Sequence, residues 1–306
     1  MTVSGPISAA SAAIHVWCNL CGADDAETIF EAGVAQTSRI VRCRRCALMY
    51  SNPRSRPVDQ EIIQTYDAKL TRDPEAYDRG RYDKERIQVR DYDDTREYLA
   101  SLYPRLGTLV EIGCGTGFLL RKFHEDGWDV LGVEPDEGLC DFVERQQQLR
   151  AIPTTLEDAK ISDASVDVVV MLHVIEHLAD PLATMREIWR ILKPGGHLVI
   201  ETPRYDSLAF AVFGRRERSI SCDGHVYFFT TRTLQKLCEK AGFKLCRLCV
   251  VGRSLSLRRV VWNFIIMSKS KAVERITRKI LGGIKLDRTY VRINLRDMQR
   301  VIVQKA

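Results

Sequence analysis

Glu111-Ile112-Gly113-Cys114-Gly115-Thr116-Gly117 is the stretch of sequence that decides the fold. The apolar run at 109–112 predicts a buried strand, and Phe118–Asp126 has the apolar spacing of a helix that Gly127 ends. The three glycines between strand and helix allow a tight turn and a close approach of the backbone to a ligand. Their GxGxG spacing differs from the GxGxxG of dinucleotide-binding turns, so the turn indicates a ligand site but does not identify the ligand.

The residues after this turn alternate between buried strands and amphipathic helices. Asp180-Pro181 suits the start of a helix, because aspartate caps the first backbone amides and proline fits the first helical position. The alternation predicts an α/β fold with a parallel, doubly wound sheet, in which ligands bind beyond the carboxyl ends of the strands. The predicted strands are Val130–Glu134, Val166–Leu172 and His197–Glu201, the predicted helices lie at Glu137–Gln148 and 181–192, and Lys193–Gly196 is a predicted turn.

The composition excludes several classes of protein. The chain has 306 residues, of which 45% are hydrophobic and 28% charged, as in ordinary globular proteins. These fractions exclude a disordered chain, a collagen-like repeat and a small protein held together by disulfides. No apolar run reaches the ~18 residues of a membrane span. The N-terminal stretch lacks the basic start of a secretory signal, so we expect a cytoplasmic protein with reduced cysteines.

Two pairs of cysteines near the N-terminus have the spacing of a zinc site. Cys18 and Cys21 form one CxxC pair, Cys43 and Cys46 form the second, and 21 residues separate the pairs. Each pair can place two thiolates on one metal ion, and together they complete a tetrahedral site. Four thiolates leave no open coordination position, so we expect the zinc to be structural and to fold a segment that lacks its own core.

These patterns divide the chain into three parts. A zinc-ribbon-like module at 1–57 precedes a polar, helical lead-in at 58–107, and the main domain follows at 108–306. The end of the main domain is strongly basic, because residues 244–306 hold 16 Lys and Arg against 3 Asp and Glu, whereas the whole chain has a net charge of +6.

A basic amphipathic insertion is predicted at about 257–284. Such a segment could contact an anionic membrane, here its inner face, or it could cap the active site with its apolar side. A solvated helix face explains the same charge equally well. No motif that reads nucleic acid accompanies the charge, so we expect no nucleic-acid partner.

Taken together, these features resemble the class I S-adenosylmethionine-dependent methyltransferases. The matching segments are Glu111–Gly117, Val133–Pro135, Asp163–Val169, Glu176-His177, Leu192–Gly196 and Leu234–Phe243. The resemblance implies a Rossmann-like, seven-stranded, mostly parallel sheet with helices on both faces and an antiparallel last strand at Met298–Val303. The four-cysteine module resembles that of zinc-containing sugar C-methyltransferases, and the chain also resembles methyltransferases of the quinone-biosynthesis type.

The cofactor site follows from this resemblance residue by residue. Glu134 ends a predicted strand, where a carboxylate can accept hydrogen bonds from both ribose hydroxyls. The resemblance implies that the methionine end of S-adenosylmethionine lies against Glu111, Gly113, Cys114, Gly115, Thr116 and Gly117, and the ribose beside Glu134 and Pro135. It further implies that the adenine lies near Leu156, Glu157, Asp158 and Leu172, and the sulfonium near His173.

The acceptor side of the site is less determined by the sequence. If the acceptor is a hydroxyl or an activated carbon, a general base helps methyl transfer. His225 and His177 are the candidates, with Tyr227 as a further polar group, although either histidine could instead only shape its loop. The expected acceptor is a small molecule: a sugar nucleotide, or an intermediate of a glycan or secondary metabolite. The alternatives are an O-methyltransferase acting on a lipidic quinone precursor and a catalytically inactive zinc-ribbon binding protein.

Overall fold

The computed structural model describes residues 14–32, 38–54, 89–217, 220, 224–257, 260 and 290–306. The part of the predicted lead-in at 58–88 lies outside these residues, as does nearly all of the basic insertion at about 257–284. In the described part of the chain, none of the helices combines the length and apolar character that crossing a membrane requires.

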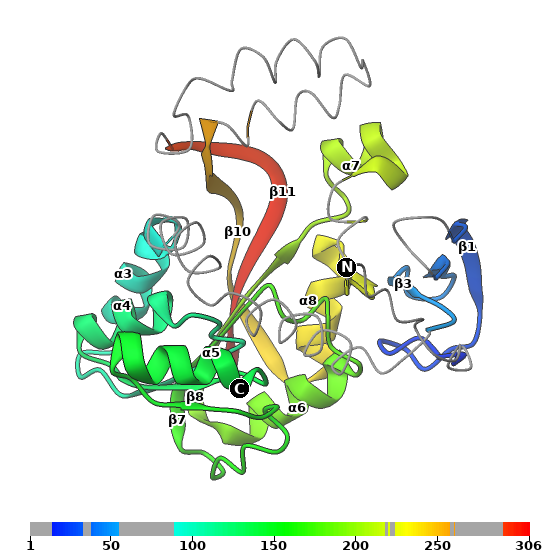
Figure 1. The fold of residues 1–306 in the computed structure, drawn as a ribbon. Helices are drawn as coiled ribbons and strands as arrows, with labels where there is room; N and C mark the ends of the chain where they lie inside the picture. The colour runs from blue at the N-terminus through cyan, green and yellow to red at the C-terminus, as the bar shows by residue number, and fades with distance from the viewer. Residues whose placement is uncertain are drawn as a thin grey trace, which may run out of the picture.

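A seven-stranded sheet forms the centre of the main domain (Figure 1). Its strands are β4 (Thr108–Ile112), β5 (Asp129–Val133), β6 (Ala151–Ile152), β7 (Val166–Leu172), β8 (Leu192–Pro203), β10 (Phe243–Ser256) and β11 (Tyr290–Lys305). They lie in the order β10-β11-β8-β7-β4-β5-β6, and the five strands from β8 to β6 are parallel. The last strand, β11, lies between β8 and β10 and is antiparallel to both. This topology confirms the predicted Rossmann-like fold with its antiparallel last strand.

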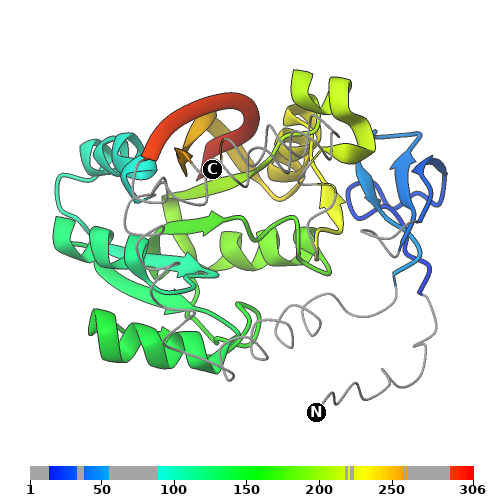
Figure 2. The same ribbon diagram turned by 45° about the horizontal axis from the view of Figure 1, so that its top comes forward.

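Helices cover both faces of this sheet (Figure 2). Along β7, Val168 and Val170 pack on one face, while Val169 and Met171 pack on the other, because successive side chains of a strand point to opposite sides. The first face carries α3 (Asp93–Leu102), α4 (Phe118–Asp126) and α5 (Glu137–Phe142), which continues as a π-helical turn at Val143–Gln147. The second face carries α6 (Pro181–Ile191) and α8 (Thr231–Lys240). The remaining short elements are η1 (Val89–Tyr92), α7 (Leu208–Phe213) and η3 (Gly214–Arg216).

The ends of two helices follow from their capping residues. Gly127 ends α4 with a left-handed backbone (φ +106°), and its N–H donates to the carbonyl of His124. The Asp180 carboxylate accepts a hydrogen bond from the Ala183 N–H at 2.9 Å and so begins α6. Both boundaries were predicted from the same residues.

One boundary prediction was wrong. The segment Lys193–Gly196, predicted as a separate turn, lies within β8, which already begins at Leu192. Val166 of β7 pairs with Leu192, whereas Val168 pairs with His197. The pairing of β7 with β8 is therefore irregular at this point, where β8 has more residues than β7, and it continues on both sides of the irregularity.

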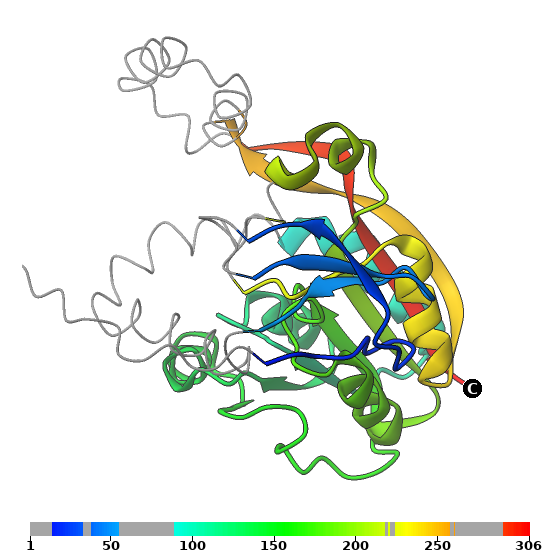
Figure 3. The same cartoon turned by 90° about the vertical axis from the view of Figure 1, so that its right-hand side faces the viewer.

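The N-terminal cysteine module contributes three strands to a second sheet (Figure 3). Its four antiparallel strands lie in the order β1 (Ala26–Phe30), β2 (Ile40–Cys43), β3 (Met49–Ser51) and β9 (Tyr227–Phe228). The fourth strand, β9, comes from the main domain, so the module and the main domain share backbone hydrogen bonds. The module boundary predicted at residue 57 lies outside the described residues.

Candidate active site

The glycine turn after β4 has the backbone that its sequence requires. Gly113, Gly115 and Gly117 all have positive φ angles, of +68°, +54° and +71°. A Cβ atom on Gly113 would lie 2.4 Å from Cγ2 of Val174, and one on Gly117 would lie 2.9 Å from Cγ2 of Val143. A Cβ on Gly115 would meet nothing within 4 Å. The turn therefore packs against the loop that follows β7, while its centre borders open space that a ligand could fill.

Glu134 lies beside this turn, immediately after β5. Its Oε2 accepts a hydrogen bond from the Gly115 N–H at 3.0 Å, and its Oε1 accepts one from the Asp136 N–H at 3.3 Å. The side chain is half-buried, and Pro135 directs the chain away from the sheet. The carboxylate is thus held at the carboxyl ends of β4 and β5, where it was predicted to hold a ribose.

The other residues expected around the cofactor occupy two environments. Glu111, Cys114 and Thr116 are buried within or beside the turn, and burial raises the pKa of the Cys114 thiol above its usual range. The residues expected near the adenine lie on the loop after β6 and at the end of β7. Glu157 accepts a hydrogen bond from the Thr184 hydroxyl, Asp158 accepts one from the Thr155 hydroxyl, Leu156 is buried, and Leu172 is half-buried.

His173 follows β7 and contacts two buried carboxylates. Its Nε2 lies 3.3 Å from Oε1 of Glu201, and its Nδ1 lies 3.7 Å from Oε1 of Glu176. Burial opposes a charge on the imidazole, but the two carboxylates outweigh this effect and raise the pKa of His173 to about 9. Burial also opposes charge on the carboxylates, yet His173, together with the other imidazoles near Glu176 and with Arg300 near Glu201, lowers the pKa of both carboxyl groups to about 2. At neutral pH a charged, partly exposed imidazole therefore faces two buried carboxylates.

This arrangement makes stability depend on pH. The His173 contribution is complete below the unfolded pKa of about 6.5 and is lost as the pH rises through about 9. Because the side chain is 39% exposed, solvent screens its charge, and the expected loss of unfolding free energy is about 1 kcal/mol. Urea unfolding should show that the free energy of unfolding falls less between pH 6 and pH 9.5 for His173→Gln than for the unmodified chain. His124→Gln, an exposed change on α4, is the control, and an equal decrease in all three proteins would contradict the assignment.

Glu176, His177 and His225 form a cluster next to His173. One ligand-type atom from each lies within 4.8 Å of the others, and the two imidazole rings meet edge-to-face with centroids 4.6 Å apart. The His177 Nδ1–H donates to the carbonyl of Gly224 at 3.0 Å, which makes Nε2 the basic nitrogen of the neutral ring. The His225 Nε2 lies 3.9 Å from Oε1 of Glu176. Both predicted candidates for the general base are thus brought together beside one buried carboxylate.

Glu176 is held firmly within this cluster. Its Oε2 accepts a hydrogen bond from the Thr202 hydroxyl at 2.9 Å, and its side chain is fully buried. Among the described residues, none makes a hydrogen bond to its Oε1, the oxygen that faces His173 and His225. A buried carboxylate oxygen in this position can stabilise a proton on either neighbouring imidazole.

Tyr227, predicted as a further polar group on the acceptor side, is a buried residue. It belongs to β9, and its hydroxyl donates to the carbonyl of Ala179 at 3.3 Å. Its ring lies under the guanidinium group of Arg54, 4.6 Å from the centroid. Its side chain thus joins the cysteine module to the main domain, and its role toward the acceptor stays a prediction.

Three charged residues of the site have no individual role predicted from the sequence. Glu176 belongs to a motif with His177, and its place after a buried strand is the signal that could have indicated a role. Glu201 ends a predicted strand, and Arg300 interrupts the apolar run of the last strand. A charge within an apolar strand is the signal that could have identified both, because buried charges need partners.

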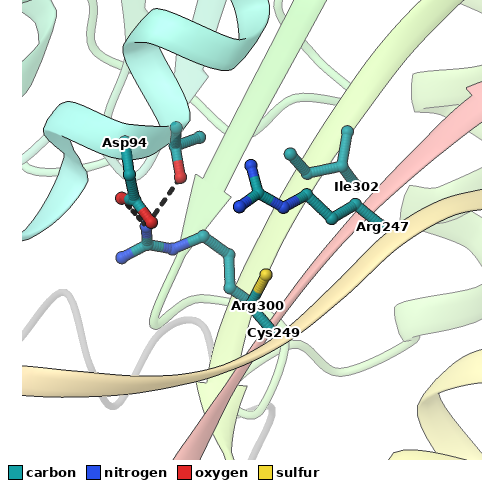
Figure 4. A pocket seen from close by; sticks show the side chains of 6 residues that line it. Asp94, Arg247, Cys249, Arg300 and Ile302 are labelled. Carbon is teal, nitrogen blue, oxygen red and sulfur yellow. Dashed lines mark hydrogen bonds and ion pairs between the residues drawn. The ribbon is translucent and has the colours of Figure 1, made fainter.

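A small pocket encloses Arg300 between α3 and the β10–β11 pair (Figure 4). It is lined by Asp94, Thr95, Arg247, Cys249, Arg300 and Ile302. The Arg300 Nη1 donates to the Thr95 hydroxyl at 2.6 Å and to the Asp94 carboxylate at 3.3 Å, and the Nε donates to Glu201 at 2.7 Å. Among the described residues that line this pocket, none is a predicted site residue. Its contacts hold Arg300 against Glu201, and so hold Glu201 beside His173.

The four cysteines of the N-terminal module converge on one point. Their sulfur atoms all lie within 4.8 Å of one another, with Cys18 Sγ 3.4 Å from Cys46 Sγ and Cys21 Sγ 3.5 Å from Cys43 Sγ. A tetrahedral zinc ion with sulfur ligands at ~2.3 Å needs sulfur atoms about 3.8 Å apart. The donor set therefore fits zinc.

The chain is similar in sequence to known methyltransferases. A family model described as a methyltransferase domain matches residues 82–248. The ubiquinone biosynthesis O-methyltransferase of Cereibacter sphaeroides is 30% identical over 183 residues, which cover 56% of this chain and 72% of the relative. The protein of the same name from Vibrio parahaemolyticus is 32% identical over 114 residues, covering 35% of this chain and 48% of the relative. This second match spans only about half of its relative's length.

Solved structures show more distant likeness. A SAM-dependent methyltransferase from Thermotoga maritima aligns with a TM-score of 0.48 at 20% identity, covering 81% of this chain and 99% of the other. The geranyl diphosphate C-methyltransferase of Streptomyces coelicolor, solved with Mg²⁺, geranyl diphosphate and S-adenosyl-L-homocysteine, aligns with a TM-score of 0.48 at 16% identity. That alignment covers 70% of this chain and 79% of the other.

Proposed function

The chain belongs to the methyltransferase-domain family, and from this premise we propose that it methylates a small-molecule acceptor whose nucleophilic atom must lose a proton. S-adenosylmethionine-dependent methyl transfer follows from the family. The observation that carries the proposal is the cluster of Glu176, His177 and His225 on loops beside the glycine turn. Two imidazoles beside a buried carboxylate are the groups expected of a general base, which a hydroxyl or carbon acceptor needs.

The residues divide the work between cofactor and acceptor. When bound, S-adenosylmethionine supplies a methyl group on a positively charged sulfur. The glycine turn and Glu134 would hold its methionine and ribose parts, respectively, and the open space above Gly115 fits a ligand placed there. His225 or His177 would remove the acceptor proton, and Glu176 would stabilise the resulting imidazolium. Aligning the acceptor with the methyl group and excluding water would supply much of the remaining rate enhancement.

Two acceptor classes suit this chemistry. We place a sugar nucleotide, or an intermediate of a glycan or secondary metabolite, first, because the cysteine module resembles that of sugar C-methyltransferases. A lipidic quinone precursor methylated on oxygen is the second class, favoured by the names of the sequence relatives. In both classes the acceptor carries a proton that must leave as the bond to the methyl carbon forms.

A labelling assay tests the proposal. The purified chain is incubated with methyl-labelled S-adenosylmethionine and, separately, with nucleoside diphosphate sugars or with polyprenylated catechols in vesicles. We expect label in a product of one class and little label with a His177→Asn, His225→Asn double variant. Equal labelling by the double variant would contradict the proposed base. Failure of the chain to bind the cofactor in calorimetry would instead support the inactive binding protein.

We also propose that the four cysteines hold one structural zinc ion. Metal analysis of the purified chain should give one zinc per chain, and a Cys43→Ala, Cys46→Ala double variant should lose it, because two thiolates cannot complete the tetrahedral site. The control is Cys246→Ala, which removes an exposed thiol of β10 outside the module. An unchanged zinc content in the double variant would contradict the site, and two zinc ions in the unmodified chain would show that a second group of residues binds metal.

A further inference from the structure

Strand β9 connects the cysteine module directly to the histidine cluster. His225 lies two residues before Tyr227, the first residue of β9, and Tyr227 pairs with Tyr50 of β3. The Ser51 N–H at the end of β3 also donates to the carbonyl of Val226, at 2.9 Å. The module therefore holds the backbone in place from Val226, the residue that directly follows His225.

The same strand fixes the backbone of Glu176. The N–H groups of Val226 and Tyr227 both donate to the Glu176 carbonyl, at 2.9 and 3.0 Å. The distance between His225 and the Glu176–His177 segment is thus set by β9, which in turn is paired with β3. A displacement of β3 would change the relative position of the base candidates and their carboxylate.

Two side chains of the module add further connections to the loop after β7. Arg54 lies over the ring of Tyr227 and donates to the Ala179 carbonyl at 3.0 Å, the same oxygen that the Tyr227 hydroxyl contacts. Asn19, located between Cys18 and Cys21, accepts a hydrogen bond from the Leu182 N–H at 3.0 Å. Its amide also donates to the Asp180 carboxylate at 2.6 Å, so the first cysteine pair is attached to the start of α6.

The cysteines and the catalytic loop also share a hydrophobic core. Cys18, Cys43 and Cys46 belong to the same buried cluster as Ile175, the neighbour of Glu176, and Val226, the neighbour of His225. A small module held by metal ligands loses its structure when the metal is removed. Its loss would therefore expose apolar surface directly behind the histidine cluster.

We propose that the four-cysteine module is a positioning element for the catalytic cluster, and that metal binding by the cysteines sets the relative positions of Glu176, His177 and His225. Arg54 and Asn19 act as positioning residues that transmit this constraint. The inference rests on the proposed function in one respect, the assignment of the cluster as the base. The glycine turn and Glu134 follow β4 and β5, whereas the hydrogen bonds of the module described above go to β9, to the loop after β7 and to the start of α6, so cofactor binding is expected to survive loss of the metal.

Nuclear magnetic resonance of ¹⁵N-histidine-labelled chain tests this coupling without an acceptor. The chain has six histidines, and His→Asn variants assign their ring signals. In the zinc-free Cys43→Ala, Cys46→Ala variant we expect the signals of His177 and His225 to shift or broaden, while those of His124 and His197 stay unchanged. Cofactor affinity should stay within about threefold, and turnover with an acceptor should fall by about 10–100-fold, as displacements near 1 Å can cause. Cys246→Ala is the matched control for the loss of a thiol.

A second variant keeps the test decisive if the double variant does not fold. Arg54→Met retains all four cysteines and should retain zinc, but it removes the hydrogen bond to Ala179; the same two histidine signals should change. Unchanged His177 and His225 signals in Arg54→Met and in any folded zinc-free variant would overturn the inference. A chain whose histidines respond but which binds no S-adenosylmethionine would refute the proposed function and leave the coupling in place.

Discussion

Replacing His225 with asparagine should lower the rate of methyl transfer by about 10²–10⁴-fold, the range that a positioned general base contributes. Asparagine keeps a polar side chain in the buried position but cannot take up a proton in the assay range. The loss should appear in kcat, measured with saturating acceptor, while the dissociation constant for S-adenosylmethionine stays nearly unchanged. His124→Asn, an exposed change on α4, is the matched control and should retain the full rate.

The pH dependence of the rate distinguishes a base from a structural residue. The pKa of Glu176 is lowered to about 2, so its carboxylate is charged throughout the assay range and stabilises an imidazolium beside it. The rate of the unmodified enzyme should rise with pH as the base loses its proton, and His225→Asn should lose this rise. If His225→Asn keeps most of the rate and the same profile, the residue only shapes its loop. The same measurement on His177→Asn then tests the alternative base.

Replacing Glu134 with alanine should weaken S-adenosylmethionine binding by about 10²–10⁴-fold. Two charge-assisted hydrogen bonds to the ribose hydroxyls would be lost, each worth about 1.5–3 kcal/mol. Folding should be affected much less, because the carboxylate is half-buried and its hydrogen bonds from the Gly115 and Asp136 N–H groups are local. Calorimetry gives the affinity, and urea unfolding of the same preparations gives the stability.

Glu137→Ala is the matched control for this change. Glu137 is an exposed carboxylate at the start of α5, three residues after Glu134, and its loss changes the local charge by the same amount. Its affinity for the cofactor should equal that of the unmodified chain. If Glu134→Ala and the unmodified chain bind S-adenosylmethionine with equal affinity, Glu134 does not bind the ribose.

Most of the central sheet could be predicted because local patterns determine it. β7 was predicted with its observed bounds, since a run of apolar residues without helical spacing fits a strand buried on both faces. The ends of α4 and α6 followed from Gly127 and Asp180, whose capping roles depend only on adjacent backbone. The irregularity in β8 could not be predicted, because it depends on how β7 pairs with two segments of β8.

The acceptor side of the site could be predicted only in part. His177 and His225 are predicted candidates, but no local pattern indicates that Glu176 lies between His173 and His225. Arg300 and Glu201 are separated by 99 positions in the chain and meet only because β11 lies next to β8. Sequence spacing carries no information on such a pair, although each charge in an apolar strand signals that a partner exists.

The place of Tyr227 shows the same limit. β9 has only two residues, and its partner β3 lies in a different part of the chain. A strand of this length has no periodicity to detect, so the sequence favoured a loop near the acceptor. The pairing of β9 with β3 places the tyrosine beneath Arg54 and makes it part of the connection to the cysteine module.

Hydrogen–deuterium exchange of the full chain, with and without S-adenosylmethionine, tests most directly that the glycine turn and the residues after β5 form the cofactor site. A bound ligand should slow amide exchange in peptides covering 111–117 and 134–140, because it orders the turn and shields the backbone around Glu134. Peptides covering the pocket around Arg300, at 247–253, should exchange at the same rate in both samples. Protection confined to other peptides, or no protection at saturating cofactor, would contradict the account.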